Sequence, residues 1–276
     1  MDWTPRTRSS GATLSEPVVG VVFPGQPRAR VADTTVPPSC WVGRLVTSWP
    51  DGSRTWGTAT LLDDRHLITC AHNFYNTRVG VGAAQATFWP GLNRDAHGGL
   101  VQPYNALPVL RYRVPDIYQR IGGPPPGPGG IPSNEITRYL YDYAVARLGT
   151  AISDPPGDSQ FDTSWPGTNV VDGLQCTILG YSGDLDTTGC TQYTRSGAVR
   201  VDDGENFLLY QMSTYHGDSG APVFYQPPGR HFWRIVGVHV SGVPSTPGTT
   251  NGRNFAVALT EDVIAHLQQM LNQVDS

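Results

Sequence analysis

The stretch His216-Gly217-Asp218-Ser219-Gly220-Ala221-Pro222-Val223-Phe224 decides how this chain is organised. A serine between two glycines, followed by a β-prone Pro-Val-Phe, is typical of a hydroxyl displayed on a tight turn before a strand. Serine alone is a poor nucleophile and needs a positioned base, which in turn needs an orienting carboxylate. Ser219 is therefore a candidate nucleophile, and this interpretation depends on finding both partners upstream.

Both partners are present, in an order that discriminates between folds. The run 66–72 (HLITCAH) predicts a strand that ends at His72, and the run 139–148 (YLYDYAVARL) predicts a strand with Asp142 near its start. The order His, Asp, Ser differs from the Ser, acid, His of α/β-hydrolases and from the Asp, His, Ser of subtilisins. The α/β-hydrolase turn G-x-S-x-G would also place Gly at 221, where this chain has Ala.

Composition and the spacing of strand-like runs predict an all-β chain. Gly (32) and Pro (24) make up about a fifth of the 276 residues, and only 15% are charged, which favours short strands and turns. One helix is expected after the N-cap Thr260, from the helical spacing of apolar residues between Val263 and Leu271. Further strands are expected at 41–49, 55–62, 86–89, 107–114, 175–181, 191–201, 207–212, 221–225, 233–240 and 254–258.

Turn-rich segments divide the chain. Residues 1–17 are polar and without period, which indicates a removable propeptide or a flexible tail. Residues 151–168 form the best linker, so we expect an N-terminal unit at 18–150, a C-terminal unit at 169–259 and the helix at 260–276. The Gly-Pro run at 122–130 is expected to be a surface loop.

Charge and hydropathy exclude several partners. With a net charge of −4 and scattered Lys and Arg, the chain is not expected to bind nucleic acid or acidic membranes. No apolar run reaches the ~18 residues of a spanning helix, and residues 1–16 lack the apolar core of a signal peptide, which leaves localisation open.

The four cysteines show no C-x-x-C spacing, so zinc is not expected. Disulfides Cys176–Cys190 and Cys40–Cys70 are one interpretation, and four buried thiols are the other.

Three motifs carry a resemblance to a known family. The runs 67–72 (LITCAH), 141–145 (YDYAV) and 217–222 (GDSGAP), with 235–239 (IVGVH) and 260–263 (TEDV) in support, resemble chymotrypsin-like serine proteases, most closely their glutamyl endopeptidase branch. The resemblance covers about residues 18–272. It implies two antiparallel six-stranded β-barrels and a C-terminal α-helix, with the site between the barrels.

The resemblance and the chemistry together imply roles for the residues. His72 is the expected base, Asp142 orients it, and the N–H groups of Gly217 and Ser219 form the expected oxyanion hole. We expect polypeptide substrates, a monomer, secretion by analogy, and no cofactor or catalytic metal, with the acidic run 202–205 a solvated turn rather than a calcium site. The alternative is a catalytically silent binding module that uses the same cleft.

Pocket residues point to a preference for an acidic P1 residue, the residue whose carbonyl is attacked. Ser213 stands where trypsin-like enzymes have Asp, which argues against cleavage after Lys or Arg. Thr214 and a protonated His239, on a strand that also carries Ser241, resemble the carboxylate pocket of glutamyl endopeptidases. The alternative is an elastase-like or broad specificity.

The N-terminus suggests a zymogen. Val18-Val19-Gly20 resembles the mature N-terminus of these proteases, although Pro17 makes the cleavage point doubtful. A freed Val18 amine would pair with Asp218, which stands where that branch more often has Asn, or would lie near the P1 carboxylate. A permanently attached tail is the alternative.

Overall fold

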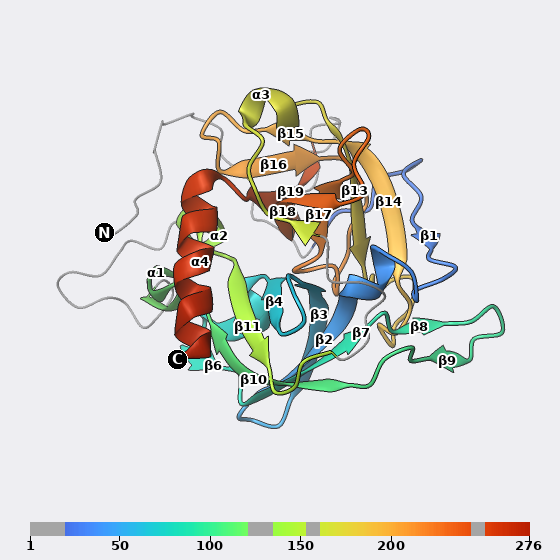
Figure 1. Cartoon of the computed structure of the whole chain (residues 1–276), viewed down its shortest axis with the longest axis vertical. Coiled ribbons are helices and arrows are strands. Elements are labelled where there is room, and N and C mark those ends of the chain that lie inside the picture. The colour runs from blue at the N-terminus through green and yellow to red at the C-terminus, as the bar shows by residue number, and fades with distance from the viewer. Residues whose placement is uncertain (1–19, 121–134, 153–160, 244–251) are drawn as a thin grey trace.

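The computed structural model describes residues 20–120, 135–152, 161–243 and 252–276. Within these ranges the chain is mostly β, with one long helix (Figure 1). Residues 1–17, Val18 and the 122–130 loop, which the sequence singled out, lie outside the described residues.

Six strands of the N-terminal half close into a barrel in the order β10-β11-β4-β3-β2-β7. All neighbours in the barrel are antiparallel, and β2 buries alternate residues, as a strand with one face toward a core should. The strands are β2 (Val42–Ser48), β3 (Arg54–Leu61), β4 (His66–Thr69), β7 (Gln85–Pro90), β10 (Leu107–Arg113) and β11 (Ala144–Leu148). Two small ribbons accompany the barrel, β5 (Tyr75–Asn76) with β6 (Val81–Gly82) and β8 (Asn93–Arg94) with β9 (Leu100–Val101).

The C-terminal half, joined by β1 from the start of the chain, forms a 9-stranded sheet in the order β1-β14-β13-β17-β18-β19-β16-β15, with β12 paired to β18 in parallel. The expected second closed barrel is therefore an open sheet among the described residues, because β1 and β15 end the path without pairing to each other. The strands are β1 (Ala29–Arg30), β12 (Phe161–Asp162), β13 (Gln175–Gly180), β14 (Tyr193–Ala198), β15 (Arg200–Val201), β16 (Phe207–Tyr210), β17 (Pro222–Tyr225), β18 (Trp233–Val243) and β19 (Arg253–Ala258).

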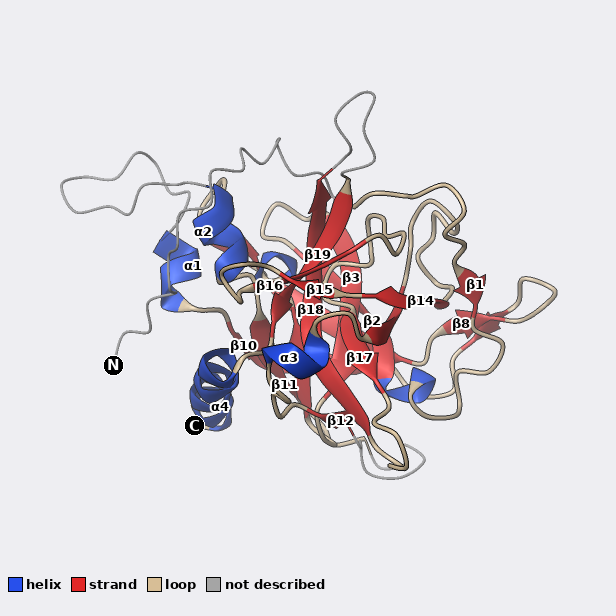
Figure 2. Cartoon of the chain, turned by 90° about the horizontal axis from the view of Figure 1, so that it is seen from above, coloured by secondary structure: helices blue, strands red, loops and turns tan. Residues whose placement is uncertain are grey.

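The expected C-terminal helix is α4 (Glu261–Asp275), which buries Val263, Leu267, Met270 and Val274. Thr260 is its N-cap, although its side chain makes no capping hydrogen bond. The short helices, which the sequence did not predict, are α1 (Asp116–Arg120), α2 (Glu135–Leu140) and α3 (Thr168–Val171), with 3-10 turns η1 (Ser39–Trp41) and η2 (Ala71–Asn73). Figures 1 and 2 show α4 on the same side of the molecule as α1 and α2, opposite β1 and β8.

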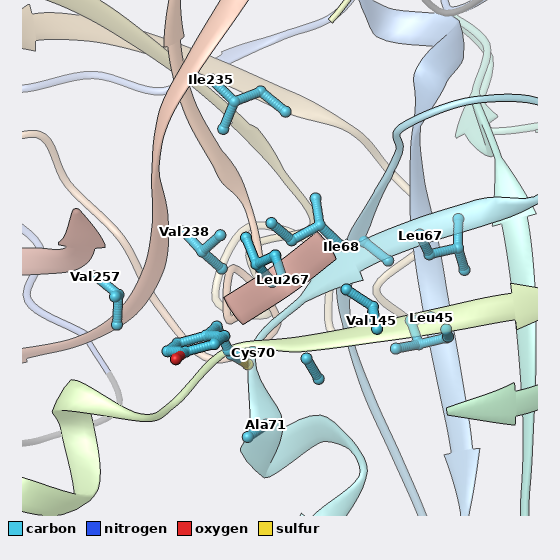
Figure 3. Packing of buried hydrophobic residues seen from close by; sticks show 14 of the residues in the cluster. Leu45, Leu67, Ile68, Cys70, Ala71, Val145, Ile235, Val238, Val257 and Leu267 are labelled. Atoms are coloured by element: carbon cyan, nitrogen blue, oxygen red, sulfur yellow. The ribbon is translucent and has the colours of Figure 1, made fainter. Parts of the chain in front are cut away.

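One hydrophobic cluster joins the two halves. Side chains of the first barrel, such as Leu45 and Ile68, share this cluster with Ile235 and Val257 of the second sheet and with Leu267 of α4 (Figure 3). The two halves therefore share a continuous core. No helix among the described residues is both long and apolar enough to cross a membrane.

All four cysteines are free thiols, so neither expected disulfide is present. The strand register gives the reason for Cys176, which lies opposite Gly197 in the β13–β14 pair. Cys190 precedes the other end of that pair, where Gly180 faces Tyr193. The two sulfurs therefore belong to opposite ends of the hairpin.

Candidate active site

His72 and Asp142 are brought together by the pairing of β4 with β11. Thr69 at the end of β4 faces Ala144 at the start of β11, so the residues just beyond these ends are neighbours. His72 lies in η2 and Asp142 in the turn between α2 and β11, and not within a strand as the sequence predicted, because α2 extends to Leu140.

Asp142 holds His72 with both carboxylate oxygens. Oδ1 accepts the His72 backbone N–H at 2.9 Å, and Oδ2 lies 2.7 Å from Nδ1. The Asp142 side chain is 1% exposed, whereas 35% of the His72 side chain stays accessible. A proton on Nδ1 directed at the carboxylate leaves Nε2 of the neutral ring as the basic atom.

The carboxylate also sets the titration of His72. Burial is the largest single influence and disfavours the charged ring, but the charge and hydrogen bond of Asp142, together with the neighbouring Cys70, outweigh it and raise the His72 pKa well above its usual range. Cys70 Sγ lies 3.4 Å from His72 Nε2, and burial raises the pKa of that thiol, which keeps it neutral. Among the described residues, no hydrogen bond joins the Ser219 hydroxyl to His72, and catalytic hydrogen bonds often tighten only when substrate binds.

Ser219 is tied to the first barrel through its backbone. Its carbonyl oxygen accepts the Thr58 N–H of β3 at 2.8 Å and the Asn73 side-chain amide at 3.1 Å. Because Asn73 follows His72 in the chain, these bonds fix the serine turn beside the His72–Asp142 pair. Ser219 itself is 5% exposed.

The turn before Ser219 leaves two backbone donors without a partner. Gly217 has φ +95°, and a Cβ built on it would overlap the Tyr181 carbonyl oxygen, so only glycine fits. The N–H groups of Gly217 and Ser219 donate to no described residue. The neighbouring N–H groups of Asp218, Gly220 and Ala221 donate to Tyr215, His239 and Asp218 respectively.

Two pocket residues carry buried polar atoms without partners. Thr214 and His239 are 0% exposed, and neither Thr214 Oγ1 nor His239 Nε2 has a hydrogen-bond partner among the described residues. His239 Nδ1 lies 2.7 Å from the Tyr210 hydroxyl. Burial, and then the charge of Arg195, lower the pKa of His239 well below its usual range. This direction favours a neutral His239 ring, in contrast to the protonated ring that the sequence predicted.

The other predicted pocket residues have different environments. Ser213 accepts the Phe23 N–H and donates to the Gln26 carbonyl, both at 2.9 Å, so its hydroxyl holds the N-terminal segment. Ser241 lies on β18, is 4% exposed and follows the irregular register at His239.

The first described residues pack beside the pocket. Val21 donates its N–H to Asn254 Oδ1 at 2.8 Å, and its carbonyl accepts the Thr214 N–H at 3.1 Å. The segment that follows Val18 therefore runs along one of the predicted pocket residues.

Sequence reasoning missed Arg195, which pairs with Asp218. Arg195 Nη2 lies 3.0 Å from Asp218 Oδ1, and the two side chains are 2% and 0% exposed. Asp218, expected to bind a freed Val18 amine, thus already faces a buried cation. Arg195 lies at a buried position of β14, opposite Ile178 of β13. A charged residue at a position of a strand that faces the core was the one feature that could have indicated a buried ion pair.

Possible metal ligands gather beside His72. Cys70, His72 and Asp142 are the one group of three such residues in the described part of the chain, with ligand atoms within 4.8 Å of one another. The Nδ1 that faces Asp142 is already engaged with that carboxylate. In the acidic run 202–205, Asp202 accepts the backbone N–H groups of Asn206 and Phe207, each at 2.7 Å, and closes a turn.

A barrel and a second sheet that meet at a His–Asp pair and a glycine-flanked serine define a chymotrypsin-like serine protease, and solved structures agree. A glutamyl endopeptidase structure matches with a TM-score of 0.67 and 25% identity over 90% of this chain and 98% of that one. The protease Anisep from Arthrobacter nicotinovorans shares the fold, with a TM-score of 0.61 and 16% identity over 90% of this chain and 99% of its own.

Sequence comparison places the chain more narrowly. It is 30% identical over 252 residues to a glutamyl endopeptidase of Bacillus licheniformis, covering 89% of this chain and 67% of that protein. A glutamyl endopeptidase of Staphylococcus aureus is 23% identical over 262 residues, which are 92% of this chain and 60% of that protein. The chain belongs to the glutamyl endopeptidase family and is a serine endopeptidase. No family model matches it.

Proposed function

We propose that Ser219, His72 and Asp142 act as the catalytic triad. Ser219 Oγ attacks the scissile carbonyl carbon while His72 Nε2 takes the hydroxyl proton. His72 then gives this proton to the leaving amine as the C–N bond breaks, which leaves an acyl-enzyme. Water then attacks the acyl carbon while His72 takes a proton from it, and as the ester C–O bond breaks His72 gives this proton to Ser219 Oγ, which releases the acid product and the free serine.

The two bonds from Asp142 to His72 are the observation that carries this assignment. They orient the ring, fix the proton on Nδ1 and stabilise the imidazolium that forms during attack. The unpartnered N–H groups of Gly217 and Ser219 support a second role, since donors at this turn would bind the oxyanion. One such donor contributes about 10²–10³ to kcat in known cases.

We further propose that the enzyme prefers glutamate at P1, through Thr214 and a neutral His239. If the Tyr210 hydroxyl donates to His239 Nδ1, then Nε2 carries the proton and is an unused donor. Thr214 lies just before the turn that carries Ser219. The strand β17 follows this turn and pairs with β18, which carries His239. A substrate carboxylate would satisfy both buried donors, whereas an alanine side chain would leave them unpaired.

A peptide panel tests both proposals. Full-length protein, and the same protein cut before Val18 at an inserted protease site, are assayed with Glu, Gln, Ala and Lys at P1 and labelled with a fluorophosphonate. We expect labelling at Ser219 and a Glu preference over Gln and Ala of at least about 10²-fold. Failure of both forms to label would leave the silent binding module, and equal turnover of Glu and Ala would indicate broad specificity.

The structure offers a matched control for His239. His266 on α4 pairs its Nδ1 with the Tyr143 hydroxyl at 2.7 Å, as His239 pairs with Tyr210, and burial lowers its pKa as well. His239→Ala should remove most of the Glu preference while turnover of Ala substrates changes little, and His266→Ala should leave the preference intact. An unchanged Glu preference in His239→Ala would overturn the pocket assignment.

A further inference from the structure

We propose that Arg195 is a positioning residue for catalysis. It holds Asp218, and with it the turn that carries Gly217 and Ser219, so the turn is formed while residues 1–17 are still attached. This inference rests on the proposed triad and oxyanion hole. The sequence suggested that a freed Val18 amine pairs with Asp218. We infer that the Arg195 side chain has this role instead.

The carboxylate of Asp218 is fully enclosed by the second sheet. Its Oδ2 accepts the Ser182 hydroxyl at 2.6 Å and the Tyr215 N–H at 2.9 Å, and its Oδ1 faces Arg195. A Cβ built on Gly180 would overlap Oδ1, so the strand β13 is shaped to admit this carboxylate. Apart from Tyr215, these contacts come from the hairpin β13–β14 and its loop, and none is made by the described residues that precede β1.

Arg195 supplies the charge that this enclosed carboxylate requires. A buried carboxylate is strongly destabilised unless a cation or several donors compensate it. The guanidinium is 2% exposed and lies 3.0 Å from Oδ1 as an ion pair, although it is not aligned as a hydrogen bond. No other cation is recorded within ion-pair distance of Asp218 in the described part of the chain.

The pair acts directly on the catalytic turn because Asp218 lies between its two free donors. Asp218 N–H donates to Tyr215 O, and its carbonyl accepts the Ala221 N–H, so the ends of the turn are closed around this residue. A shift of the Asp218 side chain would therefore move the N–H groups of Gly217 and Ser219. Oxyanion stabilisation depends on those positions, whereas ground-state binding depends on them much less.

The first described residues, Val21 and Phe23, make their hydrogen bonds away from Asp218, although β1 further along pairs with the strand β14 that carries Arg195. Val21 bonds Asn254 and Thr214, and Phe23 bonds Ser213, which places the described start of the chain against pocket residues. Any effect of cleavage before Val18 should then appear in substrate affinity, and an intact chain should still form the oxyanion turn.

The experiment compares labelling rates of uncut and cut protein. Full-length protein carrying an inserted protease site before Val18 is kept intact or cut after folding, and intact mass verifies each form. We expect both forms to react with a small fluorophosphonate at Ser219 at rates within twofold. A folded uncut form that reacts more than about 10²-fold slower than the cut form would overturn the inference and leave the triad standing. Failure of both forms to react would overturn the triad itself.

Variants test Arg195 in both forms. Arg195→Met should lower kcat and the labelling rate by at least about 10²-fold per folded molecule with KM within threefold, and Arg195→Lys should recover part of the loss. Arg234→Met is the matched control, because Arg234 pairs with Asp162 at 2.6 Å outside the site, and it should stay within twofold.

A loss below tenfold in Arg195→Met would overturn the positioning role. If that variant does not fold, Arg195→Lys and the double variant Arg195→Met/Asp218→Asn replace it. The double variant removes both charges and should label faster than Asp218→Asn alone, which strands the arginine. Equal rates in the double and single variants would contradict an action through the pair.

Discussion

Two buried aspartates lie beside the same serine turn, and they differ in their partners. Asp142 and Asp218 have side chains that are 1% and 0% exposed. Asp142 contacts the imidazole of His72, a ring that can take up and release a proton and is 35% exposed, whereas Asp218 contacts the guanidinium of Arg195, a group that does not take part in proton transfer. The His72–Asp142 pair can therefore take part in proton transfer, whereas the Arg195–Asp218 pair can only stabilise the conformation of the turn. Burial of a carboxylate therefore says little about its role until its partner is known.

Asp142→Asn should cause the largest loss. The amide cannot compensate an imidazolium and can favour the wrong tautomer of His72, so we expect kcat to fall by about 10⁴-fold, as in other Ser-His-Asp enzymes. Steady-state kinetics with a Glu substrate measures this loss. Asp162→Asn, at a pair outside the site, is the control and should stay within twofold. A loss below 10²-fold would mean that Asp142 does not orient the base.

Asp218→Asn should lower kcat less, by about 10²-fold, because it perturbs the positions of the Gly217 and Ser219 N–H groups and leaves His72 intact as the base.

The variants of the two aspartates should differ in the pH dependence of activity. Asp142→Asn should move the acid limb of kcat/KM to lower pH, since it removes the charge that raises the His72 pKa. Asp218→Asn should keep the wild-type limb. The distinction between the pairs fails if both variants shift the limb equally.

The pH profile of the wild-type enzyme tests the responsive pair alone. Burial lowers the His72 pKa, but the charge of Asp142, together with Cys70 and the hydrogen bonds to both groups, raises it well above its usual value near 6.5. Only the neutral ring can take the serine proton, so activity is present above this pKa and falls about tenfold per pH unit below it. A substrate with Gln at P1 should be used, because it does not titrate itself. An acid limb at or below pH 6.5 would contradict the raised pKa.

Much of the fold could be predicted because local pattern and tertiary structure agree. The runs around β2, β3, β7 and β10 alternate or bury residues as strands do, and the apolar spacing after Thr260 gave α4. The short helix α2 was missed because its residues, which include Tyr139 and Leu140, suit a strand equally well. The open second sheet depends on which edges pair, and local pattern does not determine edge pairing.

The site was predictable to the extent that its residues lie in motifs. His72 and Asp142 adjoin strands that pair, so their contact follows once the order of motifs indicates the fold. Arg195 belongs to no motif, and only the tertiary packing of the folded chain brings it next to Asp218. The neutral state of His239 was missed for a similar reason, because the desolvation and the nearby positive charge that lower its pKa arise only in the folded chain.

Cys70, which also contacts His72, supports the prediction with the smallest expected effect on activity. Cys70 Sγ is 3.4 Å from Nε2, the atom that should accept the serine proton. A buried neutral thiol is a weak hydrogen-bond partner, so Cys70→Ala should leave kcat/KM within about twofold and lower the free energy of unfolding by about 1 kcal/mol. Cys176→Ala, which removes a thiol from a separate cluster, should show a similar loss of stability by urea denaturation. If activity falls more than tenfold in Cys70→Ala but not in Cys176→Ala, the Cys70 thiol takes part in positioning Nε2, and the orientation of His72 depends on Cys70 as well as on Asp142.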